Sequence, residues 1–423
     1  MEIYVEKFGG ASVNSASAVK NVFSILQKTN NKRVVVISAM GKTTNKLENI
    51  VNLWYKEKSF NEEQFKDLYD YHKGIIKELF YENSDIYLRH IDGLFIDLRN
   101  KINSIDNDNY DFLYDSVVSY GERISTYIVS SFLNYAGLKN KLVQSSSFVK
   151  TDNNYRSANV LWEETKKKTN ENILPLFDQT SIIITQGFVG GTIENLATTL
   201  GREGSDYSAS IIAYCLNARQ MTIWKDVEGL LNCDPKRMPN STKILQIPYS
   251  EAIELSYYGA SIIHPKTIKP LENANIPLYI KSFLNPDNEG SLICKDKAIK
   301  PIVANFIFKD NQTLLSISPK DMSFIDEKNL SLIYSILFKH KIKVNIMQNS
   351  AISFSLCFDR NDNIFKELMQ DLQNEFMVRY NNGLQLITIR HYTQQAIKEV
   401  VGKRKIIIEQ KSRITAQYLI NEK

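Results

Sequence analysis

Residues 2–13 have the sequence Glu-Ile-Tyr-Val-Glu-Lys-Phe-Gly-Gly-Ala-Ser-Val, and this stretch decides the fold. Its first half, residues 2–6, is rich in β-branched and aromatic side chains and predicts a buried strand. The paired glycines predict a tight turn. A helix is expected at residues 15–28, where apolar residues recur at helical spacing behind a candidate N-cap, Ser15. A strand, a glycine turn and a helix in this order begin an α/β layer fold.

The glycine turn also has the chemistry of an anion site. Gly9 and Gly10 allow the backbone to approach a ligand closely, and their amides favour negative charge together with the following helix N-terminus. Lys7 adds a full positive charge. The turn therefore predicts a phosphate site, with a plain turn and an exposed Lys7 as the simpler alternative. It is neither a Walker loop nor a GxGxxG fingerprint.

Further apolar runs favour a parallel sheet that is covered on both faces, because their apolarity is continuous. These predicted strands span residues 33–38, 181–186, 220–224 and 276–281. Residues 51–110 differ, since they have helical spacing and few turn signals, and they predict a helical insertion that caps the sheet.

A second region begins after a turn at residues 285–290. We therefore expect a catalytic domain at residues 1–295 and a binding region at residues 301–423. The second region has neither a nucleotide loop nor paired catalytic carboxylates, and its pattern is typical of small split βαβ modules. The predicted strands are 314–318, 344–348, 353–358, 385–390, 405–410 and 414–420, and the predicted helices are 329–340, 363–375 and 394–401.

Composition excludes several classes of function. The 423 residues carry a net charge of +5 that is spread along the chain, without the basic stripe that nucleic-acid binding requires. The lysines at 166–168 are expected on a solvated helix face. No apolar tract predicts a membrane span, and the N-terminus does not resemble a signal peptide. Four distant cysteines form no CxxC pair, so we expect neither zinc nor disulfides, and a cytoplasmic protein.

Residues 198–208 form a polar glycine loop in front of an apolar helix. Arg202 is suited to clamp a carboxylate through its planar guanidinium, while the helix N-terminus offers hydrogen-bond donors. Ser205 or Asp206 can also act simply as the helix cap. The two interpretations are compatible.

Two shorter segments are weaker candidates. Residues 120–125 place Glu122 beside an arginine, which alone is equally typical of an exposed ion pair. Residues 38–45 form a turn of small residues at the carboxyl end of a predicted strand. In open α/β sheets, ligands collect at such ends.

Taken together and in this order, these segments resemble the aspartate kinases of the amino-acid kinase family. The resemblance covers nearly the whole chain and is carried mainly by residues 7–13, 186–207 and 257–265. It implies the amino-acid kinase fold followed by ferredoxin-like ACT modules, usually two per chain, with a short second module here. It also implies ATP-dependent phosphorylation of the side-chain carboxylate of L-aspartate, the first step toward lysine, threonine and methionine. Mg²⁺ would be bound chiefly through phosphate oxygens and water, without a metal cage in the protein.

The resemblance assigns roles to individual residues. Lys7 would neutralise charge on the transferring phosphoryl group beside the amides of Gly9 and Gly10, and Asp206 would orient Lys7. The substrate-binding residues would be Ser38, Thr44, Glu122, Arg202 and Ser205. The glutamate would face the α-amino group and the arginine a carboxylate. Phosphoryl transfer depends mostly on positioning and electrostatics, so the attacking carboxylate needs no general base.

The nucleotide side departs from the family pattern. Residues 224–236 resemble the family's WTDVxGIYTTDPR segment, but Lys225, Leu231 and Lys236 replace threonine, tyrosine and arginine, and Ser261 replaces a lysine elsewhere. The expected nucleotide-binding residues are Lys7, Gly9, Gly10, Lys225, Asp226, Leu231, Lys236 and Ser261. We hypothesise that Lys225 supplies the charge that is lost at Ser261.

Residues 340–350 resemble the ACT strand that recognises an effector in lysine-regulated members. The expected effector residues are Met322, Val344, Asn345 and Ser350. Asn345 and Ala351 stand where those members carry acidic groups, so an ammonium group would lose its counter-charges. Lysine, threonine and no effector all stay open. The modules are expected to pair chains into a homodimer or a larger assembly.

Two rival functions stay open. One is a kinase of another carboxylate, such as acetylglutamate or glutamate. Glu122 argues against an N-acetylated substrate, because it would meet a free ammonium. The other is a non-catalytic amino-acid sensor whose nucleotide pocket has decayed, which the substitutions on the nucleotide side favour.

Overall fold

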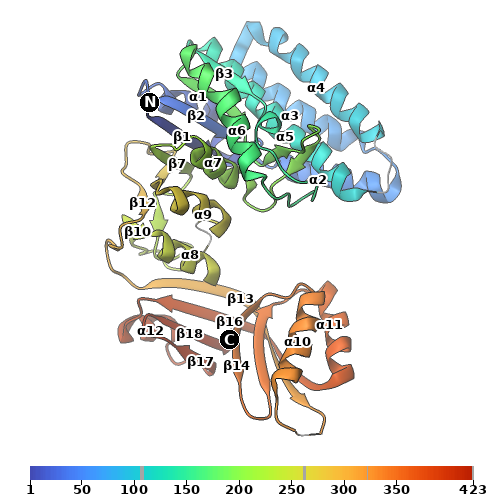
Figure 1. Cartoon of the computed structure of the whole chain (residues 1–423), viewed down its shortest axis with the longest axis vertical. Coiled ribbons are helices and arrows are strands. Elements are labelled where there is room, and N and C mark those ends of the chain that lie inside the picture. Colours follow the sequence, from blue (N-terminus) through green and yellow to red (C-terminus); the bar gives the residue numbers. More distant parts are fainter. Residues whose placement is uncertain (105–108, 261–262, 322, 422–423) are drawn as a thin grey trace. The chain divides into compact units, whose positions relative to one another are not determined.

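The computed structural model of the chain describes residues 1–104, 109–260, 263–321 and 323–421 (Figure 1). The chain forms two compact units. The first contains Met1–Leu230, Lys243–Ile253 and Ile262–Pro301, and the second contains Leu231–Thr242, Glu254–Ser261 and Ile302–Lys423. Both units are discontinuous in sequence, whereas the domains expected at 1–295 and 301–423 are continuous. That division therefore stays a prediction.

The first unit is built on an eight-stranded sheet with the strand order β10-β12-β11-β7-β1-β2-β4-β3. Its strands are β1 (Ile3–Phe8), β2 (Lys32–Ile37), β3 (Asn140–Val143), β4 (Ile182–Gln186), β7 (Gln220–Lys225), β10 (Gln246–Pro248), β11 (Leu278–Ser282) and β12 (Ser291–Cys294). All neighbouring strands are parallel except β11 and β12. The five strands predicted in this region correspond to β1, β2, β4, β7 and β11, with small shifts at their ends.

Strand β1 lies inside this sheet, with β2 on one side and β7 on the other. The chain reaches β2 through the helix α1 (Ala16–Leu26) and returns to the other side of β1 only much later. Such a reversal of strand order opens a crevice at the carboxyl ends of the strands. Ser15 is the N-cap of α1, because its hydroxyl oxygen accepts a hydrogen bond from the amide of Ala18 at 3.2 Å, as predicted.

Four helices of the first unit come from the predicted insertion, which is larger than residues 51–110. Its helices are α2 (Thr43–Glu57), α3 (Glu62–Phe80), α4 (Ser84–Ser104) and α5 (Tyr110–Tyr135). Figure 1 shows them gathered on one side of the sheet. Their buried residues share one apolar core with β1, β2 and β4, so the insertion is part of the main core.

The remaining elements of the first unit are short or cover the sheet. They are α6 (Trp162–Ile173), α7 (Gly204–Cys215), α9 (Pro265–Ala274), the hairpin β5 (Val189–Gly191) and β6 (Ala197–Thr199), and the single turns η1 (Gly10–Val13), η2 (Tyr81–Asn83), η3 (Ser145–Ser147) and η4 (Leu174–Asp178). The helix α8 (Tyr249–Tyr258), the strand β8 (Leu230–Leu231) and its partner β9 (Lys243–Ile244) lie where the chain passes from one unit to the other.

The second unit is one antiparallel sheet with the order β14-β15-β13-β16-β18-β17. Its strands are β13 (Asn305–Pro319), β14 (Val344–Asn349), β15 (Phe354–Asp359), β16 (Phe376–Arg390), β17 (Ile406–Lys411) and β18 (Thr415–Asn421). Its helices are α10 (Glu327–Lys339), α11 (Asp362–Glu375) and α12 (Gln394–Val401). The predicted order of strands and helices in this region is confirmed.

Two central strands are far longer than predicted. Residues 305–309 of β13 pair with the end of β16, and residues 312–319 pair with its beginning, with a register shift between Lys309 and Gln312. The two halves of β13 also belong to separate apolar clusters, one with α10 and α11 and the other with α12. One half of the sheet, packed against α12, therefore contains residues 305–309 of β13, and the other half, packed against α10 and α11, contains residues 312–319. The predicted strand 314–318 was too short because Lys309, Asp310 and Gln312 interrupt the apolar pattern.

In the part of the chain that the structure describes, no helix is long and apolar enough to cross a membrane.

Candidate functional site

A cavity of about 780 Å³ opens at the carboxyl ends of β1, β2 and β7, in the first unit. It brings together residues that the sequence assigned to catalysis, substrate and nucleotide. Among its lining residues are Lys7, Gly9, Gly10, Ser38, Thr44, Glu122, Arg202, Ser205, Asp206, Lys225 and Asp226. Leu231 and Lys236 belong to the second unit and do not line this cavity, and Ser261 lies outside the described residues. The roles of these residues stay predictions.

An ion pair crosses the floor of the cavity. Lys7 Nζ, at the end of β1, lies 2.6 Å from Asp206 Oδ1, in the first turn of α7. Both side chains are buried, with 9% and 5% of their residues' surface exposed. A buried charge needs a partner, and here the partner also fixes where the ammonium points. The geometry is therefore that of a held cation at the end of the central strand.

Position 10 has to be a glycine because the turn after β1 packs closely against the turn after β2. A Cβ atom on Gly10 would lie 2.8 Å from the carbonyl oxygen of Ala39 and 2.9 Å from that of Gly41. The amide of Gly41 donates to the carbonyl of Gly10 at 3.1 Å. The turns that follow β1 and β2 thus touch through their backbones. The sequence had explained this glycine only by the approach of a ligand.

The insertion helix α3 fastens the same two turns, which the sequence did not predict. Tyr71 Oη donates to the carbonyl of Asn14 at 2.7 Å, just after the first turn. The same hydroxyl would lie 2.9 Å from a Cβ atom on Gly41, whose φ is +56°. The neighbouring His72 is fully buried and lies 3.4 Å from Thr43 Oγ1 through its Nε2. The insertion therefore positions the two turns that follow β1 and β2.

Glu122 is a buried carboxylate that is only half satisfied. Its Oε1 accepts a hydrogen bond from the amide of Ala39 at 3.3 Å. Its Oε2 has no hydrogen-bond partner among the described residues. Burial raises the pKa of Glu122 to about 8, against the smaller opposing effects of backbone hydrogen bonds and the charge of Lys7. Gly121 allows this approach, since its added Cβ would lie 3.0 Å from Ala39 Cβ. A free carboxylate oxygen in a cavity suits a cationic ligand.

Arg156 and Asp115 were missed by sequence reasoning. Arg156 lines the cavity from a loop and has a φ of +65°. Its amide donates to Asp115 Oδ2 at 2.9 Å, and the amide and hydroxyl of Thr199 donate to the same carboxylate at 2.8 and 2.6 Å. Burial raises the pKa of Asp115 to about 6. In the sequence, the one indication of this contact was Asp115 itself, an aspartate within the mainly apolar residues 113–118 of α5.

Trp224 lines the cavity together with Lys225 and Asp226, two of the residues that the sequence assigned to the nucleotide. Its ring stacks on Phe8, with centroids 5.8 Å apart and planes 8° apart. Its Nε1 donates to Glu6 Oε2 at 2.9 Å. These contacts fix the end of β7, which Lys225 completes and Asp226 follows.

The expected effector residues lie in the second unit. Val344 and Asn345 are on β14, and Ser350 follows it and is exposed. Met322 lies outside the described residues. A crevice beside Val344 and Asn345 has no volume for even a water molecule. That crevice therefore offers no ready cavity for an effector beside Val344 and Asn345.

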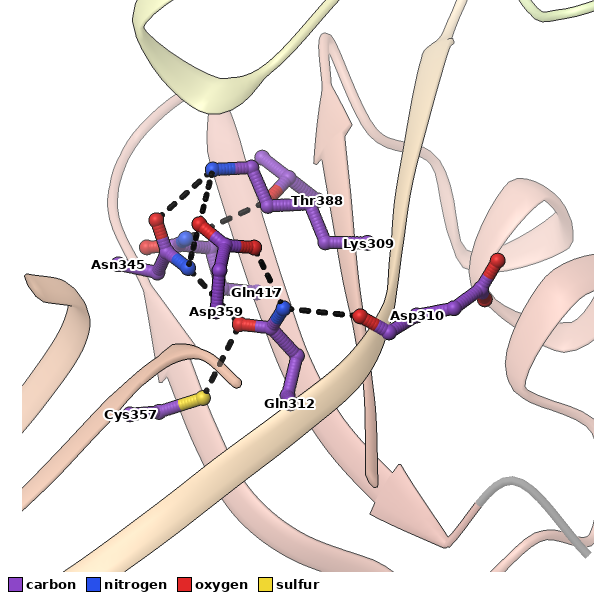
Figure 2. Close-up of polar contacts among 8 residues, drawn as sticks. All are labelled: Lys309, Asp310, Gln312, Asn345, Cys357, Asp359, Thr388 and Gln417. Atoms are coloured by element: carbon purple, nitrogen blue, oxygen red, sulfur yellow. Dashed lines mark hydrogen bonds and ion pairs between the residues drawn. The ribbon is translucent and has the colours of Figure 1, made fainter. Parts of the chain in front are cut away.

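Asn345 is held inside a polar cluster, which Figure 2 shows. Its Oδ1 accepts from Lys309 Nζ at 2.8 Å, and its Nδ2 lies 2.8 Å from Gln312 Oε1 and 3.2 Å from Asp359 Oδ2. Lys309 and Asp359 are 4.0 Å apart, and burial lowers the pKa of Lys309. An acidic group therefore does lie beside Asn345, although the local sequence lacks one.

Comparison with known proteins gives the class of this protein. Residues 2–282 match the amino acid kinase family, and the chain belongs to that family.

The individual relatives are aspartokinases. The chain is 33% identical to aspartokinase 1 of Arabidopsis thaliana over 86% of its own length and 65% of that protein, and 30% identical to aspartokinase 2 of the same plant over 96% and 75%. It is 27% identical to lysine-sensitive aspartokinase 3 of Escherichia coli over 92% and 87%.

A solved structure matches the whole fold. Aspartokinase III of E. coli, in complex with aspartate and ADP, superposes with a TM-score of 0.83 at 25% identity, over 99% of this chain and 96% of that one. The same enzyme in complex with lysine and aspartate gives the same score. The predicted α/β kinase fold followed by ACT-type α+β modules is confirmed.

We expect Glu122→Gln to stabilise the protein without ligand at pH 8. The pKa of Glu122 is raised from 4.5 to about 8 in the folded state, so the wild type loses stability as pH rises between these values. The neutral amide has no such penalty. Its melting temperature should exceed that of the wild type by about 2–6 °C at pH 8 and by much less at pH 5.

Glu48→Gln is the matched control, because Glu48 lines the same cavity but is only half-buried. Equal melting temperatures of wild type and Glu122→Gln at pH 8 would show that the carboxylate is not strained.

Proposed function

We propose that the chain catalyses the ATP-dependent phosphorylation of the side-chain carboxylate of L-aspartate, which yields 4-phospho-L-aspartate. The observation that carries this proposal is the half-satisfied carboxylate of Glu122 in one cavity with the Lys7–Asp206 pair and Arg202. The first suits an α-ammonium, the second a phosphoryl group and the third a carboxylate. The aspartokinase relatives and the aspartate and ADP of the E. coli structure support it.

The substrate would be oriented by groups of opposite charge. Glu122 would bind the α-ammonium, and Arg202 a carboxylate, with hydroxyl groups of Ser38, Thr44 and Ser205 as further partners. An N-acetylated substrate has no ammonium to satisfy Glu122, which disfavours acetylglutamate. Arg156 is a second guanidinium at the cavity and a further candidate for a carboxylate.

The reaction is a displacement at phosphorus. An oxygen of the substrate's side-chain carboxylate attacks the γ-phosphorus of ATP, and the bond to the bridging β–γ oxygen breaks, with both electrons leaving on ADP. Lys7 would stabilise the charge on the transferring group, and Asp206 would keep its ammonium in place. No proton has to move from the carboxylate nucleophile at neutral pH.

The nucleotide fits the glycine turn that precedes η1. A phosphate has room to approach Gly9, since the nearest atom to an added Cβ there is Lys7 Nζ at 3.5 Å. Asp226 is available on the opposite wall. Mg²⁺ would be held chiefly by phosphate oxygens and water, and it would neutralise phosphate charge.

A direct assay tests the activity. Purified protein with Mg-ATP, L-aspartate and hydroxylamine should form aspartyl hydroxamate, and acetylglutamate and glutamate should give none. Lys7→Ala should reduce turnover at least about 1,000-fold without unfolding the chain, since it removes the charge that faces the phosphoryl group.

Absence of hydroxamate from the folded wild type would favour the non-catalytic sensor. Product with glutamate in place of aspartate would favour the other kinase.

We further propose that Lys225 binds the nucleotide in place of the charge missing at Ser261. Lys225→Ala should raise the Michaelis constant for ATP about 5- to 10-fold and leave that for aspartate unchanged, because one charge-assisted contact is lost. Lys42→Ala, which removes an exposed lysine from the turn after β2, is the control. An unchanged constant for ATP would exclude this role of Lys225.

The second unit is proposed to sense an amino acid, with lysine and threonine as candidates. One E. coli relative is named lysine-sensitive, and its solved complex contains lysine. Because Asn345 is already bound to Lys309 and Gln312, an effector at this strand has to displace internal hydrogen bonds. Titrating each amino acid into the hydroxamate assay should show at least about tenfold inhibition by one of them and little by the other. No inhibition by either at 10 mM, on the order of ten times a typical metabolite affinity, would exclude both.

Location and assembly are also proposals. We propose a cytoplasmic protein, because its four cysteines are unpaired and three of them are buried. We propose a homodimer or a larger assembly through the second unit, with light scattering as the measurement.

A further inference from the structure

A second cavity in the first unit lies apart from the one described above. It has a volume of about 390 Å³, which is enough for a small molecule. It is formed by α6, α7 and α9. None of its lining residues also lines the first cavity. Its lining residues are Trp162, Tyr207, Tyr214, Lys266, Lys269, Pro270 and Asn273.

Three aromatic rings form one wall. The rings of Trp162 and Tyr214 meet edge to face, with centroids 5.2 Å apart and planes 78° apart. Tyr207 lies two turns earlier on the same face of α7. Burial raises the pKa of Tyr207, so its hydroxyl stays neutral. Aromatic walls of this kind favour a planar, apolar ligand body.

The polar groups of the cavity are mainly hydrogen-bond donors. An indole N–H and an ammonium can only donate. Trp162, Tyr207 and Tyr214 are partly exposed, and within the described residues their side-chain polar atoms have no hydrogen-bond partner from the protein. Lys269 has only a distant partner, Glu272, at 3.8 Å, and both of these side chains are partly exposed.

We propose that this cavity is a binding site for a small planar aromatic anion, a ring that carries a carboxylate or a phosphate. The ring would lie against Trp162 and Tyr214. The anionic group would be bound by Lys266 and Lys269 at the opposite wall, on successive turns of α9. An aromatic cation is rejected, because it would meet two ammonium groups and no unpaired carboxylate among the lining residues.

The site is linked to α7, which also carries Asp206. Tyr207 follows Asp206 directly in the chain. The amide of His264, just before α9, donates to Glu203 Oε2 at 2.9 Å, just before α7. A ligand between α7 and α9 would therefore rest on two helices that are already joined at their starts. Binding itself does not depend on the proposed function.

Calorimetric titration with three indole probes tests the charge preference. The probes are indole-3-propionate, an anion, tryptamine, a cation, and L-tryptophan, which is neutral overall. Indole-3-propionate should bind at least about tenfold more tightly than tryptamine, with L-tryptophan between them.

Variants then locate the site. Lys266→Gln combined with Lys269→Gln should weaken binding of indole-3-propionate at least about tenfold. Lys295→Gln combined with Lys297→Gln makes the same change in net charge at two exposed lysines and should leave binding unchanged. Trp162→Ala should abolish binding. Hydroxamate formation by each variant, or its far-UV circular dichroism if the wild type is inactive, shows that it is folded.

Several results would overturn the proposal. They are equal affinity for the anionic and cationic probes, loss of binding in the control pair, retention of binding in the α9 pair, and no heat from any probe at 5 mM, on the order of the weakest useful affinity.

Discussion

The contact between the turns that follow β1 and β2 is the constraint on which the rest of the first unit depends. Gly10 and Gly41 touch through their backbones, and Tyr71 of the insertion helix closes over both turns. This contact helps to set the distance between Lys7, just before one turn, and Ser38 and Thr44, at the two ends of the other. The ammonium group of Lys7 and the candidate substrate hydroxyls therefore have a fixed spacing before any ligand binds, which is the preorganisation that the proposed phosphoryl transfer requires.

The charges around this contact have opposite roles in stability. The Lys7–Asp206 pair is compensated internally, whereas Glu122 keeps one oxygen without a partner among the described residues. The ion pair holds the ammonium group of Lys7 in place. The carboxylate of Glu122 has lost its water without gaining a full set of hydrogen bonds, and a bound cation would offset that cost in free energy. Asp115 is likewise compensated internally, because three hydrogen bonds use its carboxylate to tie Arg156 and Thr199 to α5.

Sequence reasoning predicted the order of elements well, because buried strands and helices leave a periodic apolar pattern. It also predicted most of the cavity, since Lys7, Glu122 and Arg202 stand in recognisable motifs. It failed where tertiary contacts override local pattern. Arg156 is brought to the cavity by a carboxylate distant in sequence. The middle of β13 is polar because side chains such as Gln312 hydrogen-bond to Asn345 and Asp359 inside the second unit.

The long strand β13 has a consequence for how the second unit folds. Because its first residues complete one half of the sheet and its last residues complete the other, neither half is a separable module. Cutting the chain between the halves would leave each with an unpaired edge, so we expect the two halves to fold as one cooperative unit. The sequence suggests two small independent modules, but the structure has one continuous sheet whose two halves share strand β13.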